Sequence, residues 1–304
     1  MSGLKLLNKS AFTLVELLVV IAVIGLLSTI VLAITSGIGD QGRIAKGLQF
    51  SQHLENGLGS DLMGRWNFDE GANDTCSDGG DVCDSSGWDN HGIFGGNVYH
   101  LASTPSGQGY SLSLDGDGDY VTMSGLNFPS SWSQPFTLAV WIYVPSDAIW
   151  SNGSSGAIIG RGIYDGSHGL IRNTTDNQVT MWVRGDGAII RSASGLISRN
   201  KWFYLVGVWT GNRVELYIDG VLQQTSADAT MAGIPGTGSW YIGNQLYFSG
   251  SRGNYYKGQV DTFSIYSIAL TSAQINSQYY TGLDGLLAEG LISKKEYQER
   301  LIKI

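Results

Sequence analysis

The chain is poor in charge, proline and cysteine. Of its 304 residues 14% are charged, 5 are proline and 2 are cysteine. The formal net charge is −8, from 18 Lys and Arg against 26 Asp and Glu, which disfavours nucleic-acid binding through a basic surface. So few prolines beside 43 glycines exclude a collagen-like or proline-rich linker protein. No GxSxG or Walker motif occurs, and the four histidines lack metalloprotease spacing.

Apolar and aromatic residues are plentiful. They make up 42% and 11% of the chain and include 9 Trp, enough for a packed core. The glycines favour short strands joined by tight turns. The length suits one large β-domain with accessory segments.

The amino terminus differs from the rest of the chain. Lys5 and Lys9 precede a run from Phe12 to Ile34 with a single charge. As a helix this run would reach about 35 Å, enough to cross a bilayer core. The basic leader is expected to stay cytoplasmic, which places everything beyond about Asp40 outside the cytoplasmic membrane. Glu16 lies within the run, where a carboxylate is costly unless it snorkels to the interface or has a partner.

The segment KSAFTLVELLVVIAVIGLL closely resembles the type IV prepilin cleavage and methylation signature. The resemblance implies that prepilin peptidase cuts between Ala11 and Phe12 and that Phe12 becomes methylated. It also implies that Glu16 pairs with the amino terminus of a neighbouring pilin-like subunit during filament assembly. The family usually has Gly where this chain has Ala11, a small residue that keeps cleavage feasible.

From Met63 to Tyr280 the pattern is of strands and turns, without a long helical period. In RVELYIDG, alternation puts Val214, Leu216 and Ile218 on a core face and leaves Tyr217 on a wetter face. About a dozen such strands predict a mainly β, two-sheet sandwich. The strand-like runs are YSLSL, DYVTM, FTLAVWIYV, AIIGR, QVTMWVRG, AIIRSA, WFYLVGVW, RVELYIDG, SWYIG and VDTFSIY.

The order WNFDEG, DSSGWDNHG, YSLSLDGDGDYVTM, KWFYLVGVWTGNRVELYIDGVL and GQVDTFSIYSIALTSAQI resembles the concanavalin A-like jelly roll of laminin G-type domains. This resemblance covers most of residues 64–280 and implies binding of a glycan or protein surface. Some relatives are glycosidases, but their strand motif of alternating Glu, Asp and Glu is missing, and only Glu70 and Glu215 occur between 63 and 280. We therefore expect no enzyme activity, with a surface-tethered glycoside hydrolase as the alternative.

Acidic residues crowd the loop from Asp69 to Asp89, and oxygen ligands on turns suit Ca²⁺. The resemblance implies a structural Ca²⁺ held by Asp69, Asn90 to Gly92, and Asp261; solvated acidic turns are the alternative. The run Asp115, Asp117 and Asp119 also has ligand-like spacing, but the partner Glu of an EF-hand loop is missing and a hairpin turn explains the spacing.

Cys76 and Cys83 lie seven positions apart in a loop predicted to be outside the cytoplasm. Oxidation is permitted there, and the intervening residues allow closure, so we expect a disulfide. Trp88, Trp132 and Trp150 fall in loops beside amide or hydroxyl residues, as sugar-stacking rings do, although buried loop anchors are the more common case. Trp141, Trp182, Trp202 and Trp209 fall in strands and are expected in the core.

The tail predicts two short helices. One starts near Leu283 and ends at Gly290, and the second follows a capping pair of Ser293 and Glu296. The predicted segments are therefore a leader (1–11), an apolar pilin-type helix (12–40), a stalk or linker with a short helix (41–62), the jelly roll (63–280) and the helical tail (281–304). Together they predict a filament subunit that displays a ligand-binding domain at the cell surface, or a lectin-like protein anchored without a filament.

Overall fold

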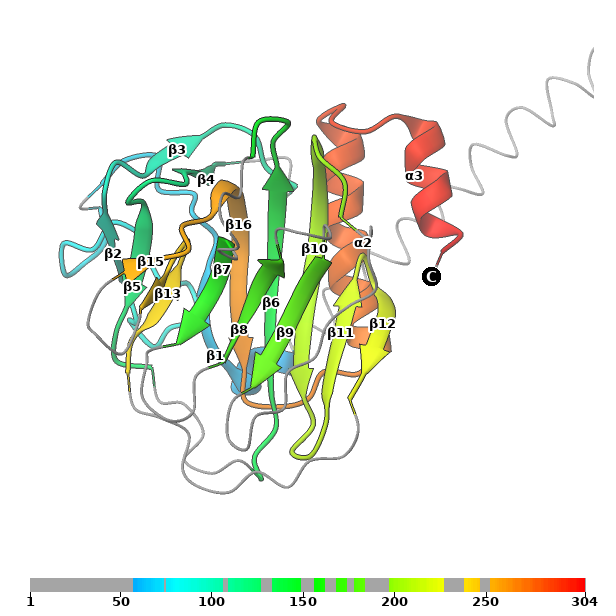
Figure 1. Cartoon of the computed structure of the whole chain (residues 1–304), viewed down its shortest axis with the longest axis horizontal. Helices are drawn as coiled ribbons and strands as arrows, with labels where there is room; N and C mark the ends of the chain where they lie inside the picture. The colour runs from blue at the N-terminus through cyan, green and yellow to red at the C-terminus, as the bar shows by residue number, and fades with distance from the viewer. Residues whose placement is uncertain are drawn as a thin grey trace, which may run out of the picture. The chain divides into compact units, whose positions relative to one another are not determined.

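The computed structural model describes residues 57–303, apart from residue 74 and the segments 106–108, 127–132, 149–155, 162–167, 174–177, 184–196, 227–237 and 247–251 (Figure 1). These residues belong to one unit, Ser51–Ile304. The predicted leader, apolar run and stalk helix, with Ala11, Phe12 and Glu16, lie outside the described residues. Within the described ranges, no helix is both long and apolar enough to cross a membrane.

The larger sheet has eight strands in the order β12-β11-β10-β6-β16-β4-β3, with β1 paired to β16. Its long central strands β10, β6 and β16 are antiparallel to their neighbours and consist almost wholly of buried residues. Its strands are β1 (Leu62–Trp66), β3 (Tyr99–Leu101), β4 (Ser111–Asp115), β6 (Phe136–Val144), β10 (Lys201–Trp209), β11 (Val214–Ile218), β12 (Val221–Thr225) and β16 (Lys257–Tyr266).

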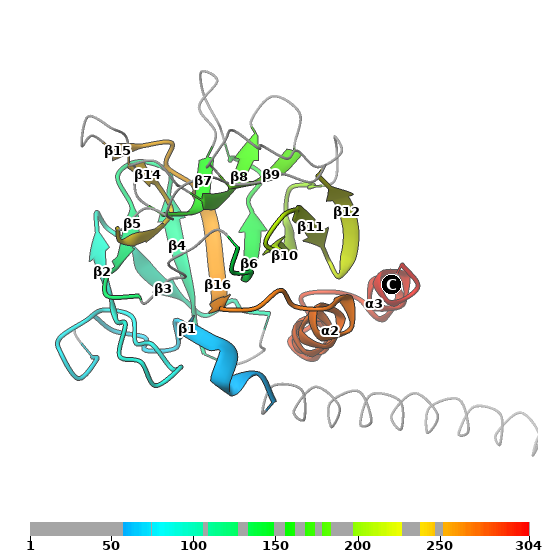
Figure 2. The ribbon, with the colours of Figure 1, turned by 90° about the horizontal axis from the view of Figure 1, so that it is seen from below.

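The second sheet has six strands in the order β2-β5-β13-β7-β8-β9, and it faces the first across the main core (Figure 2). Its strands are β2 (Gly92–Gly95), β5 (Tyr120–Met123), β7 (Gly156–Arg161), β8 (His168–Asn173), β9 (Gln178–Val183) and β13 (Trp240–Ile242). A separate two-stranded sheet pairs β14 (Gln245–Leu246) with β15 (Arg252–Gly253), and a 3-10 helix, η1 (Gly59–Asp61), precedes β1. The predicted mainly β, two-sheet sandwich is confirmed.

Two helices, α2 (Ser272–Ala288) and α3 (Lys294–Leu301), follow the last strand. The predicted start near Leu283 and the expectation of no helix before Tyr280 are wrong, because α2 begins directly after Thr271. Thr271 Oγ1 accepts a hydrogen bond from the Gln274 backbone N–H, and Gln274 Oε1 accepts one from the Thr271 N–H. This capping box fixes the start of α2. The predicted cap of α3 is confirmed, since Ser293 Oγ accepts from the Glu296 N–H at 3.1 Å.

Helix α2 covers the side of the larger sheet that faces away from the smaller one (Figure 2). A second apolar cluster lies under it and includes Trp141, Trp202 and Tyr217. Val214, Leu216 and Ile218 lie in the main core as predicted. The expectation that Tyr217 lies on a wetter face is wrong, because its side chain is only 6% exposed in the layer next to the helices.

Candidate ligand-binding site

Trp88 is the most exposed tryptophan in the described part of the chain, at 63%. Its indole N–H donates to the backbone carbonyl of Leu62 at 2.9 Å. This hydrogen bond ties the ring of a loop residue to the first strand. The ring therefore has a fixed orientation while most of its surface remains open to a ligand.

The loop that carries Trp88 is folded around the carboxylate of Asp84. Asp84 Oδ1 accepts hydrogen bonds from the N–H groups of Arg65 and Ser86, both at 2.9 Å, and Oδ2 accepts one from the N–H of Asn90 at 3.1 Å. A carboxylate that collects three N–H groups around a turn is a strong local organiser. Asp84 is buried, so this arrangement is part of the protein interior rather than a solvated acidic turn.

Trp88 forms part of the wall of a pocket of about 410 Å³. Asn90, only 8% exposed, donates from its side-chain amide to the Met63 carbonyl at 3.2 Å. An aromatic ring beside amide and hydroxyl groups is the combination that holds a sugar ring by stacking and hydrogen bonds. The lining residues are Ser60, Leu62, Met63, Trp88, Asn90, Gly125, Gln134 and Ser267.

The sequence predicted Trp88 as a ligand-facing ring and Asn90 as a Ca²⁺ ligand. It did not indicate that Leu62, Gly125 or Gln134 would line this pocket. These residues come from distant parts of the chain, and no local pattern marks them. The other predicted rings, Trp132 and Trp150, lie outside the described residues.

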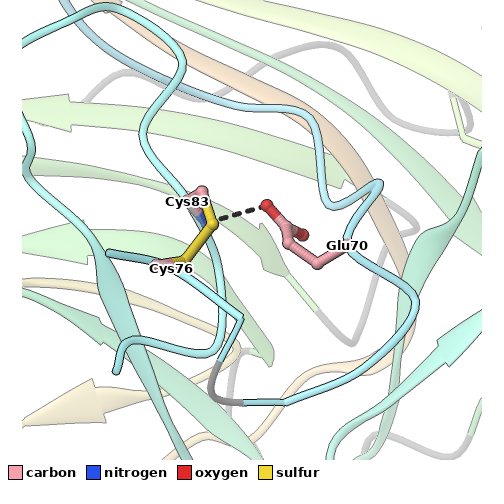
Figure 3. Close-up of side chains that lie close together, drawn as sticks. All are labelled: Glu70, Cys76 and Cys83. Carbon is pink, nitrogen blue, oxygen red and sulfur yellow. Dashed lines mark hydrogen bonds between the residues drawn. A yellow bond between two sulfur atoms is a disulfide. The ribbon is translucent and has the colours of Figure 1, made fainter. Parts of the chain in front are cut away.

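The predicted disulfide is confirmed: Cys76 and Cys83 are bonded, with Cα atoms 5.3 Å apart. Figure 3 shows Glu70 beside the bond, where its Oε1 accepts from the Cys83 N–H at 2.8 Å. In the described part of the chain, these three residues form the one group of His, Cys, Asp or Glu atoms with metal-like spacing. Disulfide sulfurs are not thiolates, so this group is a structural anchor for the loop rather than a metal site.

The residues predicted to hold Ca²⁺ are only partly brought together. Asp261 is 1% exposed and accepts from Thr104 Oγ1 at 2.5 Å and from Thr262 Oγ1 at 3.2 Å. The pKa of Asp261 is raised to about 7, mainly by burial and in smaller part by the nearby negative charge of Asp69, while the hydrogen bond from Thr104 lowers it. A cation beside these two carboxylates would relieve both effects, so this pair fits Ca²⁺ chemically.

The other two predicted ligands are engaged elsewhere. The Asn90 carbonyl accepts from the indole N–H of Trp66 at 2.9 Å. The Gly92 carbonyl accepts from the N–H groups of Asp81 and Val82, at 2.9 and 3.2 Å. The Ca²⁺ site therefore stays a prediction, with Asp69 and Asp261 as its remaining candidate ligands.

The second acidic run forms a hairpin turn between β4 and β5. Asp119 is fully buried and accepts from the N–H groups of Asp115 and Asn97, at 2.9 and 2.7 Å. Asp115 Oδ1 accepts from the N–H of Asp117 at 2.7 Å. These hydrogen bonds show that the three carboxylates stabilise the turn, which explains their spacing.

The family model of the concanavalin A-like lectin/glucanases superfamily matches residues 96–276. The chain belongs to this superfamily. A second model, of the prokaryotic N-terminal methylation motif, matches residues 6–32, so the superfamily domain is fused to a prepilin-type amino terminus. Neither match assigns a catalytic activity to this chain, and the expectation that the chain is not an enzyme remains a prediction. No curated protein matches this chain.

Solved structures share the fold at low sequence identity. The receptor binding domain of botulinum neurotoxin C/D mosaic serotype has a TM-score of 0.55 at 16% identity, over 74% of this chain and 52% of that one. Domain 4 of AbnA, an extracellular arabinanase of Geobacillus stearothermophilus solved with arabinotriose, has a TM-score of 0.52 at 18% identity, over 71% of this chain and 97% of that one. This superfamily member thus spans about half of the toxin structure and nearly all of the arabinanase domain.

Proposed function

We propose that this protein is a prepilin-like subunit, a minor pilin or pseudopilin, that displays a saccharide-binding domain outside the cell. Prepilin peptidase cuts it between Ala11 and Phe12, its apolar helix anchors it in the cytoplasmic membrane, and Glu16 pairs with another pilin-like subunit. The methylation motif at residues 6–32 supports the assembly part of this proposal.

The observation that carries the binding function is the exposed ring of Trp88, held by the Leu62 carbonyl. A large apolar side chain left in water loses free energy that burial would supply. The hydrogen bond from the Trp88 indole N–H to the Leu62 carbonyl already fixes the ring. Stacking of a sugar therefore costs little additional side-chain entropy of Trp88. The arabinanase domain solved with arabinotriose has the same fold, which makes a neutral oligosaccharide the first ligand to test.

The second part of the proposal is that Asp69 and Asp261 bind a structural Ca²⁺ ion. With Ca²⁺ bound, both carboxylates would stay ionised, and the buried strand β16 would be linked to the segment that follows β1. The ion would stabilise the domain and take no part in chemistry.

Titration of the detergent-solubilised full chain with arabinotriose and other neutral oligosaccharides, followed by tryptophan fluorescence, tests the binding function. Trp88→Ala is expected to weaken binding about tenfold, and Trp88→Phe to retain most of it. Tyr99→Ala, which removes another exposed ring, is the matched control. Equal affinities for the wild type and Trp88→Ala would contradict the site.

Intact-mass measurement of the protein from its native membrane tests processing. A chain that begins at methylated Phe12 supports assembly, whereas an uncut leader leaves a tethered binding protein that forms no filament.

A further inference from the structure

A small pocket opens on the helix-covered side of the larger sheet, with walls that come mainly from β1, β16, α2 and the segment after β1. Its volume is about 220 Å³, less than the roughly 300 to 1,000 Å³ of pockets that hold drug-sized molecules. Its rim is accessible, because Asp69 and Thr281 are exposed and Asn67 is half-buried. A small solute can therefore enter this pocket.

Two hydroxyl groups that line the pocket lack a hydrogen-bond acceptor. Tyr266 OH accepts from Arg65 Nη2 at 3.0 Å and from Gln278 Nε2 at 2.7 Å, and Ser264 Oγ accepts from Arg65 Nε at 3.3 Å. Among the described residues, no acceptor takes the hydrogen of either hydroxyl. Ser264 and Tyr266 are nearly fully buried, and a buried O–H without an acceptor is costly. Since both residues line the pocket, a bound acceptor can satisfy them.

Arg65 gives this end of the pocket a positive charge. Its side chain is half-buried, and the two hydroxyl groups of Ser264 and Tyr266 orient its guanidinium. A carboxylate at this end would meet the guanidinium and both O–H groups together. Hydrogen bonds between charged groups of this kind are roughly twice as strong as those between neutral groups.

The other end of the pocket carries a negative charge. Asp69 and Thr262 line the pocket there, and the charge of Asp69 acts on Asp261, the residue before Thr262. Ser264 and Tyr266 are two and four residues further along β16. At the rise of an extended strand, the two charged ends are about 7 to 13 Å apart.

The backbone is strained at the negative end. Thr262 has φ of 44°, within the register shift of β16 between Asp261 and Ser264, and Phe68, directly before Asp69, has φ of 62°. Neither a β-branched nor an aromatic residue favours this left-handed region. Strained residues of this kind cluster at binding sites and active sites, where they hold side chains in a required position.

We propose that this pocket binds a short peptide of two or three residues with both ends free. The peptide carboxylate binds Arg65, Ser264 and Tyr266, and its ammonium group pairs with Asp69. An extended chain spans at most about 3.3 to 3.6 Å per residue, so two or three residues match the distance between the charged ends and a single amino acid does not. The site includes neither Trp88 nor its pocket, so it goes beyond the proposed saccharide binding and does not depend on it.

Isothermal titration of the detergent-solubilised full chain with dialanine and trialanine tests the proposal. A chelator is present, so that no Ca²⁺ occupies Asp69. At least one peptide is expected to bind with a Kd of about 1 mM or lower, and acetylation of its amino end or amidation of its carboxyl end is expected to weaken binding about tenfold or more. Failure of both peptides to bind, or equal binding after either end is blocked, overturns the proposal.

Two variants separate a binding role from a structural one. Asp69→Asn keeps an acceptor for the Tyr110 N–H and is expected to bind the free and the acetylated peptide equally weakly. Arg65→Gln is expected to bind the free acid and the amide equally weakly. The controls, Asp89→Asn and Arg213→Gln, make the same charge changes at exposed positions and are expected to bind as the wild type does. A variant that keeps the wild-type preference for the free end contradicts the role of that residue.

Discussion

The rings of Trp141 and Tyr279 stack with centroids 5.7 Å apart and planes 17° apart, which joins β6 directly to α2. Gly282, one turn further along the helix, leaves room for the indole. A Cβ atom at that position would lie 2.2 Å from Trp141 Cζ2. The helix and the sheet thus approach as closely as the absence of a side chain allows.

Gly282→Ala is therefore expected to destabilise the domain, although alanine favours helices. The added methyl must displace a buried indole, which costs about 1 to 3 kcal/mol. Gly57→Ala is the control, because a Cβ atom at that position would meet no other atom within 4 Å. Urea unfolding curves measure both, and a Gly282→Ala variant as stable as the control would contradict the close packing.

Asp84→Asn is expected to weaken saccharide binding at Trp88, although residue 84 does not contact the ligand. The amide can no longer accept all three N–H groups, so the loop loses its organiser and about 1 to 3 kcal/mol of stability. We expect an affinity about three- to tenfold lower by fluorescence titration. Asp89→Asn makes the same charge change at an exposed position of the same loop and is expected to bind as the wild type does.

Asp261 predicts how stability depends on pH and calcium. Its folded-state pKa of about 7 exceeds its ordinary value of 3.8, so the folded state binds the proton more tightly than the unfolded chain. The carboxyl's contribution to stability is thus greatest below about pH 4 and is lost as the pH rises through about 7. Without calcium, Asp261→Asn is expected to be more stable than the wild type at about pH 8, by at most about 4 kcal/mol.

Calcium is expected to reverse this order. The ion favours the ionised carboxylate, so about 1 mM calcium raises the melting temperature of the wild type and leaves Asp261→Asn unchanged. Calorimetry with and without a chelator measures the effect. A wild-type melting temperature that is the same with and without calcium at this pH would contradict the proposed Ca²⁺ site.

Glu16→Ala tests filament assembly. The variant is expected to insert into the membrane and to be cut before Phe12, because the apolar run becomes more apolar. It is expected to be missing from filaments, since the charge that pairs with a neighbouring subunit is gone. Fractionation followed by immunoblotting measures both steps, and normal incorporation would count against the pairing.

Some features follow from local sequence. The alternation of Val214, Leu216 and Ile218 predicted the core face of β11, because the pleat of a strand sends successive side chains to opposite faces. The spacing of Cys76 and Cys83 predicted their bond, and the resemblance of residues 9–27 to prepilins agreed with the matched motif. The predicted start of α2 near Leu283 is wrong, although Thr271 and Gln274 have capping-box spacing, because the alternating strand pattern ends only just before them.

Only the tertiary structure decided which residues from distant parts of the chain lie next to each other. Leu62 reaches Trp88, and Arg252 reaches Tyr120, across long stretches of chain. Tyr217 became buried because α2 packs on its face of the sheet. Periodicity and capping act within a few residues, so sequence determines which face of an element is apolar. The partner that covers that face, or the gap left open for a ligand, depends on how distant elements pack, and no local pattern encodes that.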